Sequence, residues 1–513
     1  MSQAAPPPRA QDPAGSGRVT LLVGNTGAAS RGRKGDSARQ GGGGTGKPPA
    51  AGQSGGQGGK PQLYAARKQI YPKLAHGKFR SAKWAMMIIA LGVYYLLPWI
   101  RWPRGEGAPD QAVLADFANE RFYFFFLEIW PQEVYYITGL LILASLALFL
   151  VTSLFGRVWC GYACPQTVWT DLYIFVERAL EGDRAARMRL DKAPNTTSKV
   201  ARKVAKHTIW LLIALLTGGA FVFYFHDAPT VAAGALTGEA PLSAYVFAGV
   251  LTATTYSLAG LMREQVCTYM CPWPRIQGAL TDEHALNVTY RYDRGEPRAP
   301  LRKGEDWSKR GDCIDCNQCV QVCPMGIDIR DGAQLECIHC ALCIDACDEM
   351  MKKIGRPTGL IAYDNETAVR ARARGETPRY RLIRTRTVLY AALIVLVCGV
   401  MLAGLATRAT FELNVLKDRS PPYVQLADGG ARNGYALKIV NKDSDARTLE
   451  LSLSGLPGAT LEVVGPTEVD GLTARLDVAP NGVDRFRLLV SVAPEHLTPR
   501  TTFNLTLHDP QTG

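Results

Sequence analysis

Five long hydrophobic runs are the strongest pattern along the chain, and polar segments separate them. A helix that crosses the hydrocarbon core of a bilayer needs about 17 to 25 predominantly apolar residues. The runs meet this length, at residues 84–100, 134–155, 207–225, 242–261 and 387–406. We therefore predict an α-helical membrane core of five spans, seated in a lipid bilayer.

Lysine and arginine are distributed unevenly between these runs. The loop 156–206 carries ten of them, whereas residues 226–241 carry none. Because loops rich in Lys and Arg stay on the cytoplasmic side, we expect the N-terminus, 156–206 and 262–386 to be cytoplasmic in a bacterial inner membrane. An odd number of spans then places the C-terminal segment in the periplasm. This topology also accounts for the net charge of +12, so we expect no nucleic-acid partner.

The composition divides the chain into five parts. We expect a disordered Gly-rich arm at 1–62, because such a segment cannot bury a core. The other parts are a membrane domain with spans one to four, a cytoplasmic cysteine-rich domain, the fifth span and a periplasmic domain, at 63–271, 272–386, 387–407 and 408–513.

Two further segments have recognisable patterns. In 408–513, about seven short alternating runs are separated by Gly, Pro, Asn and Asp, which predicts an immunoglobulin-like β-sandwich. The aromatic stretch at 122–127 is too short to cross a bilayer, so we expect an interfacial or re-entrant piece there.

Eight of the thirteen cysteines repeat one spacing, C-x-x-C-x-x-C-x-x-x-C, twice between residues 313 and 347. This spacing is typical of bacterial ferredoxins with two [4Fe-4S] clusters, in which the fourth cysteine of each run binds the other cluster. A zinc site uses only four ligands. The spacing therefore predicts a dicluster ferredoxin-like α+β domain, with one cluster on Cys313, Cys316, Cys319 and Cys347, and the other on Cys337, Cys340, Cys343 and Cys323.

Four more cysteines, which we call the membrane-edge thiols, follow spans two and four in two C-x-Y-x-C-P motifs: Cys160 and Cys164, then Cys267 and Cys271. The repeat of two spans and a motif predicts a pseudo-twofold core that brings the motifs together. Because each Pro favours a first helical turn, we expect Cys164 and Cys271 at helix N-caps, where a thiolate is stabilised. With Met270 beside them, these soft ligands suit Cu(I), zinc or another iron–sulfur centre. Inert thiols or a disulfide within each pair are the alternatives.

Five spans, two C-x-x-x-C-P motifs, a dicluster segment and an immunoglobulin-like tail together resemble the CcoG/FixG (RdxA) family of polyferredoxin-type cytochrome oxidase accessory proteins. The resemblance covers about residues 63–513. It implies a cupric reductase that converts Cu(II) to Cu(I) at the membrane-edge thiols and assists assembly of cbb-type oxidases. It also implies that the eight ferredoxin cysteines bind the clusters. A copper chaperone or a copper-exporting ATPase is the expected recipient of the copper, and a cytoplasmic partner is the expected electron donor.

Two other functions fit the same residues. The chain could conduct electrons between a quinol and another redox partner, and His226 with Asp227 could touch such a quinol, although a solvated loop is the simpler interpretation. It could also be a non-enzymatic scaffold that holds oxidase subunits. Cys398, alone in the fifth span, is expected to pack as a small apolar residue.

Overall fold

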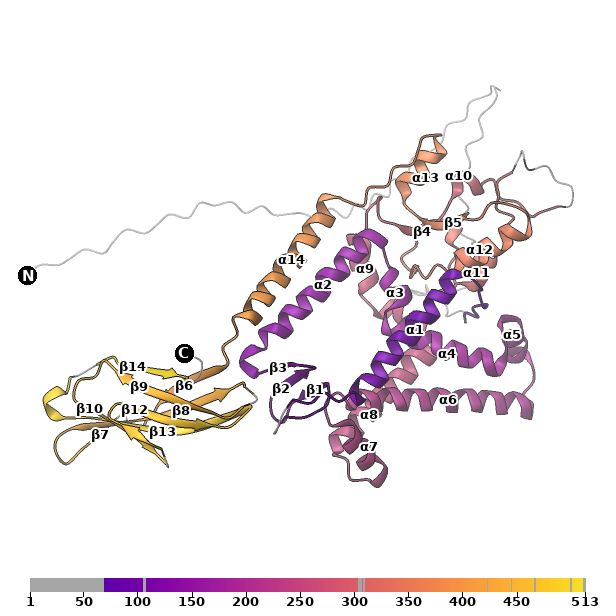
Figure 1. Ribbon diagram of the computed structural model, residues 1–513. Helices are drawn as coiled ribbons and strands as arrows, with labels where there is room; N and C mark the ends of the chain where they lie inside the picture. The colour runs from indigo at the N-terminus through magenta and orange to yellow at the C-terminus, as the bar shows by residue number, and fades with distance from the viewer. Residues whose placement is uncertain are drawn as a thin grey trace, which may run out of the picture. The chain divides into compact units, whose positions relative to one another are not determined.

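The structure is a computed structural model that describes residues 69–510 apart from 105–107, 303–306, 308–309, 422, 444, 466 and 499–500 (Figure 1). The expected disordered arm at 1–62 lies outside these residues. The described part of the chain holds a helical membrane region, a small α+β insert before the last span and a C-terminal pair of β-sheets.

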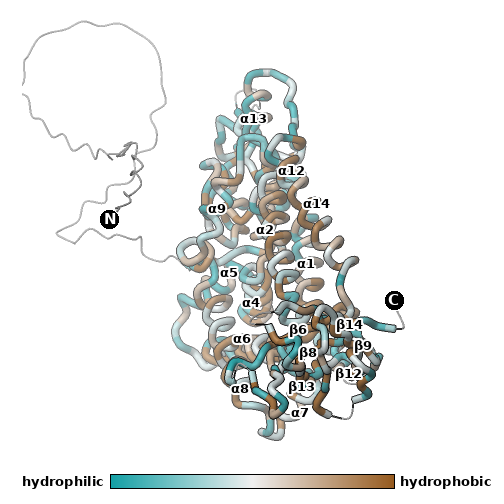
Figure 2. Tube along the Cα trace, turned by 90° about the vertical axis from the view of Figure 1, so that its left-hand side faces the viewer, coloured by the Kyte–Doolittle hydropathy of each residue, from teal (hydrophilic) through white to brown (hydrophobic). Residues whose placement is uncertain are grey.

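The five predicted spans are confirmed as long apolar helices. The membrane-length segments are Lys78–Trp99, Pro131–Phe155, Thr197–Val222, Leu242–Met262 and Thr385–Ala406. Their α-helical parts are α1 (Lys78–Leu96), α2 (Tyr135–Phe155), α6 (Thr197–Val222), α8 (Leu242–Thr255) and α14 (Thr385–Ala406). Most of their apolar side chains point outward, as lipid-facing residues do, and Figure 2 shows the hydrophobic colouring along α2 and α14.

Helix α6 begins ten residues before the predicted third span. The hydroxyl oxygen of Thr196 accepts a hydrogen bond from the backbone N–H of Lys199 at 3.3 Å and so caps the helix. The basic residues that follow belong to the same helix, which extends beyond its apolar part.

The spans pack in two groups. Helix α2 lies beside α14, whereas α6 lies beside both α8 and α4 (Pro165–Glu181) (Figure 1). Gly218 lets α6 approach α8 closely, since a Cβ there would stand 2.5 Å from the carbonyl oxygen of Ala248. After α8 the chain continues as a π-helix, Tyr256–Met262, so the end of the fourth span is not a regular α-helix.

The aromatic stretch at 122–127 is not a re-entrant piece. It forms part of a three-stranded antiparallel sheet in the order β1 (Val113–Asp116), β2 (Arg121–Phe124) and β3 (Leu127–Ile129). Phe122, Tyr123 and Phe124 pair with β1 on one side and with β3 on the other, so their backbone groups are satisfied by strand pairing.

Short elements connect the spans and form the insert. The connections contain α3 (Val158–Tyr162), α5 (Arg184–Lys192), α7 (Ala228–Thr237) and α9 (Trp273–Leu280). In the insert, strands β4 (Asn287–Tyr290) and β5 (Ile361–Asp364) pair antiparallel, and the helices are α10 (Tyr292–Gly295), α11 (Gln318–Val322), α12 (Leu342–Lys353) and α13 (Glu366–Ala373).

The C-terminal segment is a sandwich of two antiparallel sheets, as predicted. One sheet has the order β10-β13-β8-β6 with β7 paired to β8, and the other has the order β11-β12-β9-β14. The strands are β6 (Phe411–Lys417), β7 (Val424–Gln425), β8 (Ala431–Asn441), β9 (Arg447–Ser454), β10 (Ala459–Val464), β11 (Val469–Asp470), β12 (Thr473–Val478), β13 (Gly482–Val492) and β14 (Asn504–His508). Alternate residues such as Leu437, Leu451 and Leu476 fill the space between the sheets.

Candidate functional site: two cysteine cavities and a thiol motif at the membrane edge

The insert contains two neighbouring cavities that divide the eight ferredoxin cysteines into the two predicted sets. Cys313, Cys316, Cys319 and Cys347 line the first cavity, together with apolar residues such as Leu360 and Ile361. Cys323, Cys337, Cys340 and Cys343 line the second cavity, and Cys319 borders it as well. The fourth cysteine of each run therefore faces the cavity of the other run, so each cavity can hold one cluster on four sulfurs.

The backbone around each cavity has the form that an iron–sulfur cluster requires. Asp315 and Asn317 flank Cys316 with φ of 53° and 54°, and His339 and Ala341 flank Cys340 with φ of 52° and 60°. Left-handed residues that alternate with ordinary ones turn successive backbone N–H groups toward one concave side, and this arrangement stabilises anionic clusters. The two loops repeat the same conformation, so both fit a [4Fe-4S] group.

The cysteines of the insert are buried or half-buried, and burial raises the pKa of most of their thiols. The pKa of Cys319 and of Cys337 rises to about 12, and that of Cys323 to about 11. Such thiols are protonated at neutral pH, so metal binding must displace their protons. The donor set therefore fits iron, which binds cysteine as the thiolate.

The structure gathers the four membrane-edge thiols but does not close them on a single point. Burial, with added repulsion from Cys164, Cys267 and Cys271, raises the pKa of Cys160 to about 12. Burial also raises the pKa of Cys267 to about 12, with contributions from Cys164 and Cys271. Among the described residues, no three His, Cys, Asp or Glu side chains lie close enough together to hold a single metal ion.

The two C-x-Y-x-C-P motifs differ in local structure. Cys164 is the N-cap of α4, as predicted. Cys271 is not the predicted N-cap: it has an extended backbone at the C-terminal end of a π-helical turn, Val266–Met270, and Pro272 takes the N-cap position of α9. In the first motif the helix begins at Pro165, directly after Cys164, whereas in the second it begins at Trp273, one residue after Pro272. Met270 is 55% exposed, so its thioether is accessible from solvent or lipid.

The second cysteine loop (residues 335–343) lies directly against the first motif. Cys160 packs against a buried cluster that includes Ile338 and Cys340, and the Tyr162 hydroxyl donates to the carbonyl of Cys340 at 3.2 Å. At Gly161 the backbones approach so closely that a Cβ would stand 2.7 Å from the carbonyl oxygen of Ile338. No side chain separates the loop from the motif at this point.

Arg157 joins three segments at the same place. Its backbone N–H donates to Nδ1 of His339 at 2.9 Å, and its guanidinium donates to the carbonyls of Leu335 and Cys337 in the second cysteine loop. The guanidinium also donates to the carbonyl of Pro274, in the helix that follows the second motif. Cys160 donates from Sγ to Oε1 of Gln277 on that helix at 3.2 Å. The predicted meeting of the two motifs is thus found, with the cluster domain attached to both.

Comparisons with known proteins agree with this architecture. Residues 262–366 match the family model of a 4Fe-4S dicluster domain, 137–181 that of a 4Fe-4S binding domain, and 401–513 that of the IG-like fold at the C-terminus of FixG. The chain is 50% identical over 458 residues to the nitrogen fixation protein FixG of Rhizobium meliloti, covering 84% of this chain and 87% of that one. The chain belongs to the CcoG/FixG family.

Two further relatives come from Cereibacter sphaeroides. Protein RdxB is 54% identical over 79% of this chain and 85% of its own, and protein RdxA is 49% identical over 86% of this chain and 92% of its own. Together with the two 4Fe-4S matches, these relatives identify the chain as a multi-pass membrane protein of iron–sulfur redox chemistry. The predicted family, fold class and cofactor type are confirmed.

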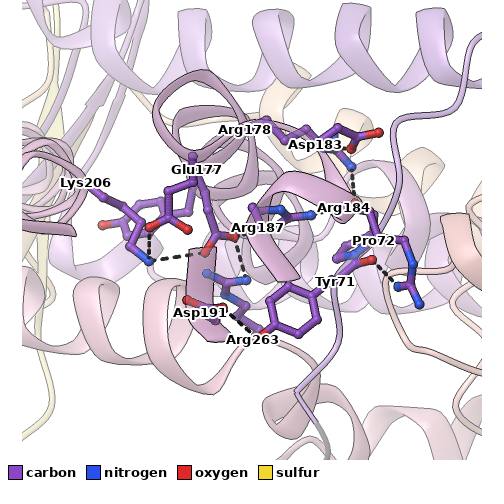
Figure 3. Close-up of polar contacts among 12 residues, drawn as sticks. Tyr71, Pro72, Glu177, Arg178, Asp183, Arg184, Arg187, Asp191, Lys206 and Arg263 are labelled. Atoms are coloured by element: carbon purple, nitrogen blue, oxygen red, sulfur yellow. Dashed lines mark hydrogen bonds and ion pairs between the residues drawn. The ribbon is translucent and has the colours of Figure 1, made fainter. Parts of the chain in front are cut away.

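This member of the CcoG/FixG family also has a buried ionic network that the sequence did not reveal (Figure 3). Glu177 on α4 accepts from Arg187 at 2.7 Å, Arg263 at 3.1 Å and Lys206 at 3.3 Å. Burial alone would raise the pKa of Glu177, but the charges of Arg263, Arg187 and Lys206 outweigh it and lower that pKa to about 2. The carboxylate is therefore ionised at neutral pH.

Arg263 connects this network to the second motif. It follows the π-helix with φ of 46°, an uncommon value for a residue with a side chain, and its Nε donates to the carbonyl of Gly260 at 2.8 Å. The carbonyl of Arg263 accepts from the Gln166 side chain, two residues after Cys164, at 3.3 Å. The network thereby fixes the start of the loop that carries Cys267. Sequence reasoning treated these charges only as a topology signal, because partners that are distant in sequence cannot be paired without coordinates.

Proposed function

We propose that this protein is a membrane-bound cupric reductase, in which Cu(II) is reduced to Cu(I) at the membrane-edge thiols. The direct contact between the second cysteine loop and the Cys160 segment carries this proposal. It brings the loop that would hold the second cluster against the segment that carries Cys160, the first of the sulfurs that would bind copper. Thiolates prefer Cu(I), so the ligands themselves favour the reduced product.

The cluster sets are part of the same proposal. Cys313, Cys316, Cys319 and Cys347 would hold one [4Fe-4S] group, and Cys323, Cys337, Cys340 and Cys343 the other. When bound, these groups supply one-electron redox chemistry. The chain's own residues orient the sites: Arg157 and Gly161 hold the loop and the motif together, and apolar residues such as Ile338 keep water out of the contact.

Copper enters this proposal as the substrate. Cys160 and Cys267 are protonated while no metal is bound, because burial raises the pKa of each to about 12. Copper binding must therefore release protons as the thiolates form. Since the four sulfurs do not yet meet at one point, binding also has to draw them together. The irregular π turn Val266–Met270 is the segment in which we expect this movement.

A second candidate function is supported by the family match over residues 137–181, which is named for 4Fe-4S binding and contains Cys160 and Cys164. In this alternative the membrane-edge thiols hold a further cluster, and the protein conducts electrons to another redox partner. Iron analysis separates the two: two clusters give about eight irons per chain and three give about twelve.

The cellular role that we propose follows from the family. The reduced copper would pass to a copper chaperone or a copper-exporting ATPase and support assembly of a cbb-type oxidase. The charge of the loops supports a cytoplasmic position for the insert and a periplasmic position for the C-terminal sandwich. Reporter fusions after α13 and after β14 test this orientation, because opposite signals are expected at the two points.

The decisive experiment mixes anaerobically reduced protein with Cu(II) and follows cluster absorbance together with Cu(I) bound to a chromogenic chelator. The test variant replaces Cys160, Cys164, Cys267 and Cys271 by Ser, and the matched control is Cys398→Ser in the fifth span. We expect the control to behave as wild type. The fourfold variant should keep its clusters and lose Cu(I) formation. Equal Cu(I) formation by both variants would overturn the proposal.

A further inference from the structure

A groove opens on the surface of α6 near the N-terminal, polar end of this helix. It has a volume of about 490 Å³ and lies between the first turns of α6 and the start of the π-helix. Its apolar wall consists of Val200, Val204 and Leu211. Each of these side chains is at least half exposed. Leu211 belongs to the apolar part of α6, whereas Val200 and Val204 lie on its basic extension. The groove therefore stands at the edge of the span, where a ligand can enter from the bilayer past Leu211.

Two side chains that can exchange protons and hydrogen bonds form the polar end of the groove. Nδ1 of His207 lies 2.8 Å from the hydroxyl oxygen of Tyr256, and both residues line the groove. In the described part of the chain this is the only hydrogen bond of the His207 ring. Nε2 is therefore available to a ligand. Tyr256 is also the first residue of the π-helix, and such irregular turns frequently occur at functional sites.

The lysines of the groove are already paired within the protein. Nζ of Lys199 donates to the carbonyls of Asp191 and Ala193, at 3.1 and 2.6 Å. Nζ of Lys203 pairs with Asp191 at 2.7 Å and with Glu181 at 3.0 Å. A lipid phosphate would have to compete with these partners. The groove thus offers a neutral polar end and an apolar wall. This combination is unsuited to an anion.

Aromatic side chains connect the groove with the network behind the thiols. The ring of His207 meets Trp210 edge-on at 5.2 Å, and Trp210 packs on Tyr173 of α4 at 5.3 Å. The guanidinium of Arg263 lies over Trp210 at 5.2 Å. Figure 3 shows Arg263 with Glu177 and Lys206, and Arg263 is four residues from Cys267. Packed rings therefore connect the groove to Arg263, at the start of the loop that carries Cys267.

We propose that this groove binds the ring of a lipid-soluble quinone, with His207 and Tyr256 as the hydrogen-bonding partners of its oxygens and its tail directed past Leu211 toward the apolar part of α6. Oxidation of a bound quinol breaks two O–H bonds and releases two protons and two electrons. Nε2 of His207 takes the first proton and the second leaves to solvent at the polar end of α6. The two electrons would pass one at a time to an iron–sulfur acceptor, the class of group that the two cysteine cavities would hold.

This inference does not rest on copper reduction. It requires only the iron–sulfur redox chemistry of the family, and it names a membrane electron donor where a cytoplasmic one was expected. The alternative position at His226 and Asp227 is less suited. Asp227 is already bound by Arg101 at 2.7 Å and by Thr230 at 2.5 Å, and it caps α7.

The test measures binding with no copper present. Purified protein in neutral phosphatidylcholine nanodiscs is titrated with decylubiquinone, and quenching of tryptophan fluorescence is followed. We expect His207→Gln and Tyr256→Phe each to weaken binding by about tenfold, the scale of one lost hydrogen bond. The matched control, His226→Gln, should bind as wild type. A photoreactive quinone should label the tryptic segments around His207 and Tyr256.

Each outcome decides the proposal. Retained cluster absorbance shows that the variants are folded, and Tyr256→Phe preserves the ring packing in any case. Equal binding by wild type and both variants, or weaker binding in His226→Gln alone, would overturn it. If anionic phospholipid displaces the quinone in wild type and His207→Gln alike, the groove is a lipid site. Quinone binding without Cu(I) formation would leave this inference standing while the copper proposal fails.

Discussion

Replacement of the buried Glu177 by Gln should destabilise the membrane-edge region more than the loss of an exposed or half-buried charge nearby. The carboxylate is 4% exposed and accepts from Arg187, Arg263 and Lys206. Glutamine keeps the shape of the side chain but removes its charge. Lys206 retains Glu181 as a partner at 2.9 Å, whereas Arg263 loses its carboxylate partner in the network. Buried cations without a counter-charge are costly.

The magnitude follows from the pKa of Glu177. The folded protein lowers it from 4.5 to about 2. Since one unit of pKa corresponds to about 1.4 kcal/mol, the ionised carboxylate contributes about 3 kcal/mol at neutral pH. For a domain of this size, that loss lowers the melting temperature by roughly 6 to 12 °C.

The pH dependence has a definite sign. Because the folded pKa lies below the unfolded one, the contribution is complete above about pH 5 and is lost progressively as the pH falls toward 2. The gap in melting temperature between wild type and Glu177→Gln should therefore be largest at pH 7 and narrower at pH 4. Scanning calorimetry or intrinsic fluorescence in detergent measures both values.

A matched control separates burial from charge. Glu349→Gln removes the partner of Lys353, an exposed pair on α12, and should change stability by less than about 1 kcal/mol. Equal melting temperatures for Glu177→Gln and Glu349→Gln would contradict this prediction. So would a difference in melting temperature between wild type and Glu177→Gln that is the same at pH 4 as at pH 7.

Two further predictions test the contact and the ligand sets. Gly161→Ala places a Cβ 2.7 Å from the backbone of the second cysteine loop, so we expect stopped-flow reoxidation of the clusters by Cu(II) to slow several-fold with iron content unchanged. Gly92→Ala, with nothing within 4 Å, should keep the wild-type rate, and an equal rate in Gly161→Ala would contradict the contact. The double variant Cys313→Ala/Cys347→Ala removes two ligands of one cluster and should keep about four irons. The double variant Cys337→Ala/Cys347→Ala removes one ligand from each cluster and should keep none. The reverse result would mean that each run binds its own cluster.

The parts that could be predicted from the sequence depend on local spacing or length. Apolar runs of membrane length fixed the five spans, and the cysteine spacing fixed the two cluster loops, because both constraints act over a few tens of residues. The crossed arrangement of Cys347 and Cys323 also followed from spacing, since it is a property of the repeated loop.

The errors came from positions where local rules compete. The aromatic stretch at 122–127 belongs to paired strands, because aromatic residues favour strands as well as membrane interfaces and the stretch is too short to distinguish the two. Cys271 missed the helix cap because the preceding turn is π-helical and takes up one more residue than an α-turn. The partners of Arg157 and Glu177 lie more than a hundred residues away or on three different segments, and no periodicity in the sequence reports such pairs.

Arg157 shows why the contact between the motif and the cluster loop needs a buried cation. Thiolates on both sides of the contact carry negative charge once metals are bound, and low-dielectric surroundings strengthen their repulsion. The guanidinium lies between them: Cys160 and Cys337 both raise its pKa, although burial lowers it overall. Its hydrogen bonds to Leu335, Cys337 and Pro274 hold it there. One side chain thus offsets the charge of both sites and fixes their separation, so a change in charge at one site is felt at the other.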